Sequence, residues 1–340
     1  MRENSVPSIP VAKQVTVCIP TTARPHFLRT ALQTVQNQIG REVIGEVIVS
    51  ENKNDRGSEA VVREFPDLPI RYLHREPTLP MLPHLFSTFR EARTPYVAIL
   101  NDDDWWCSNH LADGVGALVA NPGAVAFSSA SLFVADERSK NPRWIDRSDA
   151  VWLIAGKPSW VAPWRLDVGA MLALCWVYTP FHWSSLIARN EHLRGVMDEL
   201  ESETYHTHTI DRLVFAHLCL RGAFCYNPVP DTFVRWHTAN WIKTQSAKEI
   251  QLVVRSTVAV VERMARENGW NPRDLWKAAL PAMPPEAERE ILDRLHQAFT
   301  GDELNRLGLA GFFRARLPSG RLIALRNIAS GVKQFLIGSR

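Results

Sequence analysis

Three adjacent carboxylates, Asp102, Asp103 and Asp104, directly follow an apolar run at residues 96–100. Neighbouring carboxylates repel one another and are costly to hold together away from water without a cation. A hard divalent ion resolves this repulsion, and such an ion commonly binds one or two carboxylates together with substrate phosphates. The alternative is a solvated acidic turn in which Asp104 caps a helix. Because the triplet follows a strand-like apolar run, the sequence favours a metal–diphosphate site.

Two further residues are candidates for the same chemistry. Asp211 stands in TIDRLVFAHL, where apolar surroundings raise the pKa of a carboxyl group and suit it to act as a general base. The residues alone favour a simpler role for it, as a helix cap or as the partner of an arginine. His237 lies in VRWHTAN after an expected strand. A neutral imidazole binds divalent ions, but a lone histidine among aromatics is more often packed or exposed.

The elements that must position these side chains alternate between strand and helix. This alternation predicts a parallel sheet with right-handed crossovers, in which ligands bind beyond the carboxyl ends of the strands. Continuous apolar runs mark the strands, and apolar residues at helical spacing mark the helices. The expected strands are residues 15–20, 46–50, 70–73 and 96–100, and the expected helices between them are residues 25–35, 58–65 and 85–92.

Polar side chains fall at the ends of three of these strands. Thr21 and Thr22 follow the first strand, Glu51 follows the second, and the aspartate triplet follows the fourth. Because the carboxyl ends of parallel strands meet at one edge of a sheet, we expect these side chains to lie together. Later in the chain we expect helices at 108–120 and 209–220, strands at 124–128, 181–188 and 224–235, and a helical pattern from 241 onward.

Composition narrows the class of protein. Of 340 residues, 46% are apolar and 22% are charged, as in ordinary soluble globular chains. A net charge of +3 is too balanced for a nucleic-acid coat, so no nucleic-acid partner is expected. The five cysteines have no CxxC spacing and are expected to be reduced thiols. No apolar stretch reaches the ~20 residues of a membrane span. We therefore expect a cytoplasmic protein.

Taken together, VTVCIPTTARPHFLRTALQTVQNQ, EVIVSEN and YVAILNDDDWW resemble the opening of family 2 glycosyltransferases of the GT-A fold. The resemblance implies an α/β, Rossmann-like fold whose mostly parallel central sheet is flanked by helices, here with a helical C-terminal extension. The chain then divides into a flexible leader (1–13), a nucleotide-sugar-binding half (14–130), an acceptor-binding half with a tryptophan-rich insert (131–240), and a helical basic extension (241–340).

The resemblance implies a donor-binding role for five residues. Thr21 and Thr22 stand where the family's first loop touches the base and ribose, and Arg24 belongs to the same loop. Glu51 stands where the family uses an aspartate on the nucleobase. Asp102 stands near the ribose.

It also implies a metal site and a catalytic base. Asp103 aligns with the family's metal ligand, and Asp104 flanks it. His237 resembles a late histidine that some members use as an extra metal ligand. Asp211 resembles the acidic position that carries the catalytic base.

The implied reaction is an inverting transfer of a sugar from a nucleotide-diphosphate donor to an acceptor hydroxyl. Mn²⁺ or Mg²⁺ neutralises the leaving group, and Asp211 takes the proton. The acceptor is a glycan, a lipid-linked molecule or a small molecule. Two alternatives stay open: a nucleotidyltransferase, although TTARPHF lacks that class's glycine-rich loop, and a non-catalytic domain that binds sugar nucleotides or glycans.

The C-terminal tail has its own charge pattern. Residues 304–340 contain seven basic residues and no acidic one, with apolar residues between them. This composition suits an amphipathic helix on anionic lipid, which would make the protein peripheral at the inner membrane face. A helix packed on the body with a solvated basic face suits it equally well.

Overall fold

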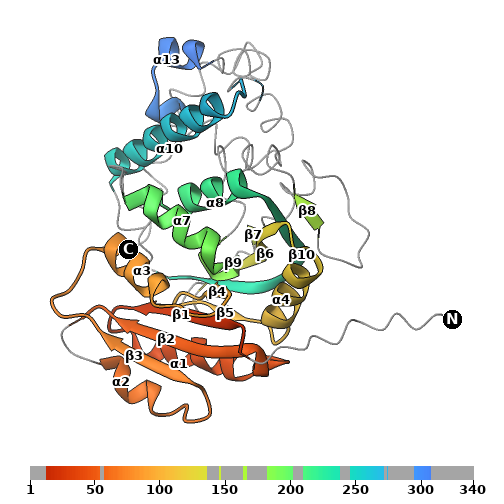
Figure 1. Ribbon diagram of the computed structural model, residues 1–340. Coiled ribbons are helices and arrows are strands. Elements are labelled where there is room, and N and C mark those ends of the chain that lie inside the picture. The colour runs from red at the N-terminus through yellow and green to blue at the C-terminus, as the bar shows by residue number, and fades with distance from the viewer. Residues whose placement is uncertain are drawn as a thin grey trace.

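A curled sheet with helices on both faces forms the body of the molecule (Figure 1). The computed structural model describes residues 13–53, 57–135, 145–146, 164–166, 182–201, 210–237, 246–271, 274 and 295–307. The leader up to residue 12, most of the tryptophan-rich insert and the tail beyond residue 307 lie outside the described residues. The expectations about those segments therefore stay predictions.

The first four strands and the last one agree closely with the expected strands, whereas the short strands at 105–106, 145–146 and 164–166 were not expected. The strands are β1 (Val15–Thr21), β2 (Ile44–Glu51), β3 (Ile70–His74), β4 (Tyr96–Ile99), β5 (Trp105–Trp106), β6 (Ala124–Ala135), β7 (Ile145–Asp146), β8 (Trp164–Leu166), β9 (Ile187–Arg189) and β10 (Ala223–Trp236).

The sheet order is β3-β2-β1-β4-β9-β6-β10-β5, with β7 beside β6 and β8 beside β10. Strands β1 to β4, β6 and β10 run in one direction, and β9 lies antiparallel between β4 and β6. The expected α/β fold with a mostly parallel central sheet is thereby confirmed.

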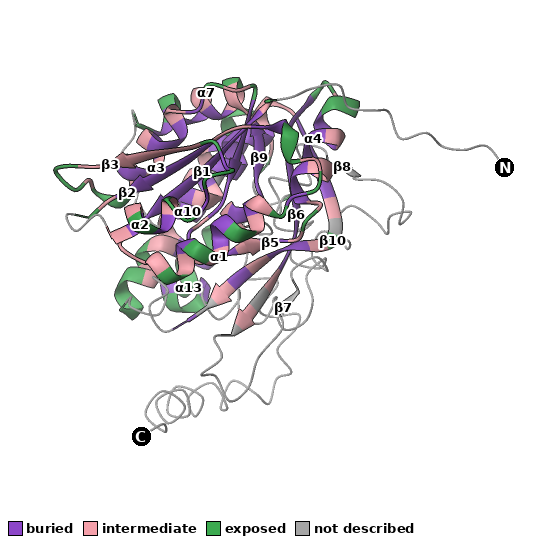
Figure 2. Cartoon of the chain, turned by 90° about the horizontal axis from the view of Figure 1, so that it is seen from below, coloured by how far each residue is buried: buried purple, intermediate pink, exposed green. Residues whose placement is uncertain are grey.

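Two layers of helices bury the two faces of the sheet. Helices α1 (Pro25–Gln36), α2 (Gly57–Val62) and α4 (His110–Ala120) pack on one face. Helices α3 (Met81–Arg90), α7 (Asn190–Glu201), α8 (Ile210–Arg221) and α10 (Ala247–Glu267) pack on the other, and α13 (Gly301–Arg306) adds Leu304 to the same core. Figure 2 shows the strands in the middle of the sheet buried and the helices exposed on their outer sides.

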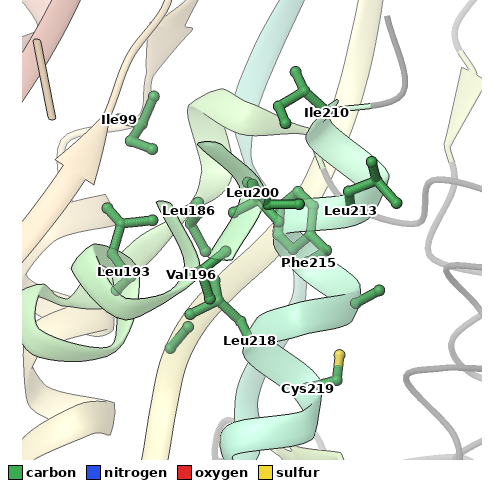
Figure 3. Packing of buried hydrophobic residues seen from close by; sticks show 14 of the residues in the cluster. Ile99, Leu186, Leu193, Val196, Leu200, Ile210, Leu213, Phe215, Leu218 and Cys219 are labelled. Atoms are coloured by element: carbon green, nitrogen blue, oxygen red, sulfur yellow. The ribbon is translucent and has the colours of Figure 1, made fainter. Parts of the chain in front are cut away.

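Alternation along the strands explains why both faces are apolar. In β1, Val15, Val17 and Ile19 join the core under α1 and α4, whereas Cys18 joins the core under α3 and α8. Successive side chains of a strand point to opposite faces, so a strand that is buried on both sides is mostly apolar. Figure 3 shows part of the core on the face covered by α3 and α8, where side chains of α7 and α8 pack together near Ile99.

One expected strand is largely a turn. Instead of a strand over 181–188, the chain forms a short 3-10 helix, η2 (Trp183–Ser185), before β9 begins at Ile187. The Ser185 hydroxyl donates to the carbonyl of His182 at 2.8 Å, and the Ser184 N–H donates to the imidazole of His182 at 3.4 Å. Such local side-chain bonds compete with a strand ladder.

Gly114 marks the tightest contact between α4 and the sheet. A Cβ at this position would overlap Ile187 Cδ1 and would stand 2.8 Å from Phe127 Cδ1. We therefore predict that Gly114→Ala lowers the free energy of unfolding by about 1–3 kcal/mol, because a packed core resists an added methyl group. Denaturant unfolding measures this change.

The matched control is Gly301→Ala in α13. No atom lies within 4 Å of a Cβ at Gly301. Alanine is the better helix former, so this variant should be as stable as the parent or more stable. Equal stability of the two variants would contradict the packing argument.

Candidate functional site

The carboxyl ends of β1, β2 and β4 meet at one edge of the sheet, as the sequence predicts. Thr21 of β1 is the register partner of Glu51 of β2. The Thr21 hydroxyl donates a 2.6 Å hydrogen bond to Asp102 Oδ2, just after β4. Thr22 lies exposed in the loop that follows β1. These four residues therefore share one rim.

Arg24 ties this rim to the aspartate triplet. Its Nε donates to Asp102 Oδ2 at 3.1 Å, its Nη2 donates to Asp102 Oδ1, and its Nη1 donates to Asp103 Oδ2 at 2.9 Å. Pro25 begins α1 directly after this arginine. Burial raises the pKa of Asp102 to about 6, although the Arg24 charge pulls in the opposite direction. Arg24 is thus the main cation facing the first two aspartates.

Asp103 is shared between Arg24 and His237. The His237 Nε2 donates to Asp103 Oδ2 at 3.0 Å, and the ring of His237 is buried, 5.0 Å from the ring of Phe27. Burial disfavours the charged form of Asp103, but the hydrogen bond from His237 and the charge of Arg24 outweigh it, so the pKa of Asp103 is lowered. Of the three aspartates, Asp103 is therefore the one whose charged form its surroundings favour.

Asp104 joins two distant parts of the chain to the triplet. Its carboxylate accepts a hydrogen bond from the Ser184 hydroxyl at 2.5 Å and one from the Arg235 backbone N–H at 3.0 Å. The imidazole Nδ1 of His182 lies 3.3 Å from Asp104 Oδ2. Burial, followed by the neighbouring charge of Asp103, raises the pKa of Asp104 well above its ordinary value. Asp104 thus connects β4 to η2 and β10.

Arg235, two residues before His237, completes the cationic side of the site. Its guanidinium lies between the rings of Phe27 and Trp105, 4.8 Å and 4.7 Å from their centroids. Its Nε donates to the backbone carbonyl of Asp103 at 3.1 Å. The sequence prediction missed Arg235, Ser184 and His182. The nearest signal for Arg235 was its position in VRWHTAN, next to the predicted histidine.

Asp211 occupies the first turn of α8, and its Oδ1 accepts from the Arg212 N–H at 2.8 Å. Phe215 lies one turn further on the same helix face. The ring of Phe215 contacts the ring of Trp183 at 6.3 Å, and Trp183 directly precedes the residue that donates to Asp104. This ring contact joins α8 to the segment that contains Ser184, but it does not bring the Asp211 carboxylate itself to the triplet.

The residues present fit a divalent ion if a substrate diphosphate supplies the remaining ligands of that ion. Within the described parts of the chain, no three His, Cys, Asp or Glu side chains form a ready-made metal site. Asp103 Oδ2 and His237 Nε2 lie 3.0 Å apart, however, which is the separation of adjacent ligands around an octahedral ion with bonds of about 2.1 Å. Two protein ligands and a substrate diphosphate form a typical set for such ions.

A family model matches the first part of this chain. Residues 16–160 match the model described as "Glycosyl transferase family 2". This segment is therefore similar to glycosyl transferase family 2. It contains Thr21, Glu51 and the aspartate triplet, whereas Asp211 and His237 lie beyond it. The family resemblance expected from the sequence is confirmed.

Solved structures confirm the fold. TarS 1-349 from S. aureus, in complex with UDP-GlcNAc, is similar with a TM-score of 0.51 at 11% identity, over 89% of this chain and 92% of that one. The mannosyltransferase PcManGT from Pyrobaculum calidifontis, in complex with GDP-Man and Mn²⁺, is similar with a TM-score of 0.50 at 19% identity, over 96% of this chain and 81% of that one. At these identities the likeness concerns the fold.

No curated protein sequence matches the chain significantly. Among the helices that the structure describes, none combines the length and the apolarity needed to cross a membrane.

His84 of α3 forms a hydrogen bond to the backbone near the end of β2. The His84 Nε2 donates to the Ser50 carbonyl at 3.0 Å, and burial lowers the pKa of His84 to about 4. Since the unfolded histidine titrates near 6.5, the native state binds fewer protons between these values. The stability supplied by neutral His84 is therefore complete above pH 6.5 and is lost as the pH falls toward 4.

We predict that His84→Gln removes this pH dependence. Between pH 7 and pH 4.5 the parent should lose on the order of 2 kcal/mol more unfolding free energy than this variant, because glutamine does not charge. Denaturant unfolding at both pH values measures the difference. His26→Gln, on the exposed side of α1, is the control and should follow the parent. Parallel curves for the parent and His84→Gln would contradict the assignment.

Proposed function

We propose that the chain is an inverting glycosyltransferase that moves a sugar from a nucleoside diphosphate to an acceptor hydroxyl with the help of a divalent ion. One observation carries the proposal beyond the family match. Asp103, the middle member of the carboxylate triplet, directs one oxygen to both Arg24 and His237 at the carboxyl end of the sheet. Ligands of open α/β sheets bind at this end of the strands.

In this proposal the donor binds along the rim. Thr21, Thr22 and Arg24 face its nucleoside and diphosphate, and Asp102 lies at the ribose. Glu51 belongs to the same end of the site, and its part is treated below. Arg24 already bonds two aspartates, so its guanidinium is oriented before the donor arrives. Such preorganisation lowers the cost of binding an anion.

Asp103 and His237 would hold the ion, with Asp104 behind them. The ion, Mn²⁺ or Mg²⁺, supplies charge neutralisation for the departing diphosphate. Asp104 would help to position the site, because its carboxylate bonds η2 and β10 to the end of β4. Arg235, fixed between two aromatic rings, adds a positive charge beside Asp103.

Asp211 is the proposed general base. It would accept the proton of the acceptor hydroxyl while the oxygen of that hydroxyl attacks the anomeric carbon from the side opposite the diphosphate. A single displacement of this kind needs one base and no second nucleophilic carboxylate.

The remaining expectations belong to the same proposal. Residues 14–130 would form the nucleotide-sugar half and residues 131–240 the acceptor half. The acceptor is a glycan, a lipid-linked molecule or a small molecule, as in polysaccharide assembly, and the reaction takes place in the cytoplasm. Any contact with a membrane surface would involve residues 304–340.

A panel of nucleotide sugars tests the reaction class. Thermal unfolding is recorded with each donor, with Mn²⁺ and with chelator, and release of nucleoside diphosphate is then measured with candidate acceptors. A donor-specific rise in Tm that chelator removes, together with release of the diphosphate, supports the transferase. Binding without release in any acceptor mixture supports a non-catalytic binding domain. Release of pyrophosphate from a nucleoside triphosphate and a sugar phosphate supports a nucleotidyltransferase.

Asp211→Asn tests the catalytic base. We predict that turnover falls by about 10²–10⁴-fold, because the amide cannot accept the proton, while the donor Kd stays within about threefold. Asp198→Asn is the matched control, because Asp198 is an exposed carboxylate on α7 whose partner is Arg90. It should leave both quantities unchanged. Unchanged turnover in Asp211→Asn would show that another group takes the proton.

A further inference from the structure

The carboxylate of Glu51 faces the protein. Its side chain is completely buried at the end of β2. Oε1 accepts the backbone N–H of Ala23 at 2.6 Å, and Oε2 accepts the backbone N–H of Ser58, near the start of α2, at 3.0 Å. Hydrogen bonds from two amides satisfy a buried carboxylate and are stronger than bonds between neutral groups. Glu51 therefore joins the loop after β1 to the start of α2.

The loop that Glu51 holds has an unusual backbone. Ala23 has φ +54°, in the left-handed region that residues with a Cβ seldom occupy. The bond to Glu51 Oε1 is made by the N–H of this same residue. A second hydrogen bond joins the loop to the end of β2: the N–H of Asn52, the residue after Glu51, donates to the Thr21 carbonyl at 2.9 Å. The strained conformation is thus maintained by the end of β2.

The residue after the strained position is Arg24, whose guanidinium bonds Asp102 and Asp103. A turn of the Ala23 backbone would redirect the arginine that follows it. A continuous path of bonds therefore runs from Ser58 through Glu51 and Ala23 to Arg24 and on to the aspartates. Each bond in this path is 3.1 Å or shorter.

We infer that Glu51 is a positioning residue that acts on donor binding through Ala23 and Arg24, and that it does not read the nucleobase. This inference rests on the proposed function and refines it. The family resemblance would place this carboxylate on the base. A carboxylate that reads a base must direct an oxygen to the ligand, whereas both oxygens of Glu51 are directed to backbone amides.

The two roles predict different results for Glu51→Gln. Glutamine keeps the size of the side chain but turns an NH₂ group toward one of the two backbone N–H groups, which disturbs the loop. A positioning role weakens UDP and GDP by the same factor, at least about fivefold, because Arg24 serves the diphosphate that both share. A base-reading role changes the ratio of the two Kd values instead. Calorimetric titration well below the Tm measures both constants.

A second substitution makes the test specific for the loop. Glycine adopts positive φ without strain, so Ala23→Gly should compensate for a weakened Glu51. We expect the double variant Glu51→Gln/Ala23→Gly to recover at least half of the lost Tm and half of the lost nucleotide affinity on a logarithmic scale. Glu59→Gln is the control, because Glu59 lies beside Ser58 on α2 and forms an ion pair with the exposed Arg63. It should change neither quantity.

The outcomes separate this inference from the proposed function. If the parent protein binds neither nucleotide, the proposed function fails, and the Tm of the double variant still tests the loop. A shift of tenfold or more in the UDP-to-GDP ratio overturns the inference, as does a double variant that recovers nothing. If Glu51→Gln alone does not fold, the inference requires Ala23→Gly to restore folding, and a double variant that also stays unfolded contradicts it.

Discussion

Three neighbouring carboxylates must be kept together at the end of one buried strand, and this requirement organises the site. Asp102 and Asp104 are almost fully buried, and Asp103 is largely so. Each burial is unfavourable unless donors or cations surround the oxygens. Groups from distant segments of the chain offset this unfavourable energy. They are chiefly Arg24 before α1, Ser184 in η2 and His237 after β10. The triplet therefore determines which loops come together.

The topology of the sheet explains how the end of β10 comes to lie beside the triplet. Strand β9 separates β4 from β6, and β10 lies parallel to β6, so the chain returns toward the triplet from the far side of the sheet. The pairing of Trp105 with Phe233 brings the end of β10 beside the aspartates. Arg235 and His237 then reach the triplet from a position more than 130 residues away in the sequence. The fold thus surrounds a repulsive motif with positively charged and hydrogen-bonding groups, at the rim where the proposed donor would bind.

The sequence predicted most of the sheet, because its central strands are apolar throughout and end in polar residues. It also placed Thr21, Glu51 and the triplet at one rim, since parallel strands end together. Sequence spacing could not reveal Arg235 or Ser184, because their role depends on how β10 and η2 return to the triplet. Nor could it reveal the orientation of Glu51, whose carboxylate is engaged by backbone amides that carry no residue signature. The turn at His182 was missed because side-chain hydroxyl bonds replaced the expected strand.

The central claim is that Asp103 and His237 form the protein's share of a metal–diphosphate site. A crystal structure with Mn²⁺ and a nucleoside diphosphate tests it most directly, through the anomalous signal of manganese. The account predicts one strong peak about 2 Å from both Asp103 Oδ2 and His237 Nε2, with phosphate oxygens completing the coordination. A peak elsewhere, with the two side chains still hydrogen-bonded to each other at 3.0 Å, would contradict it.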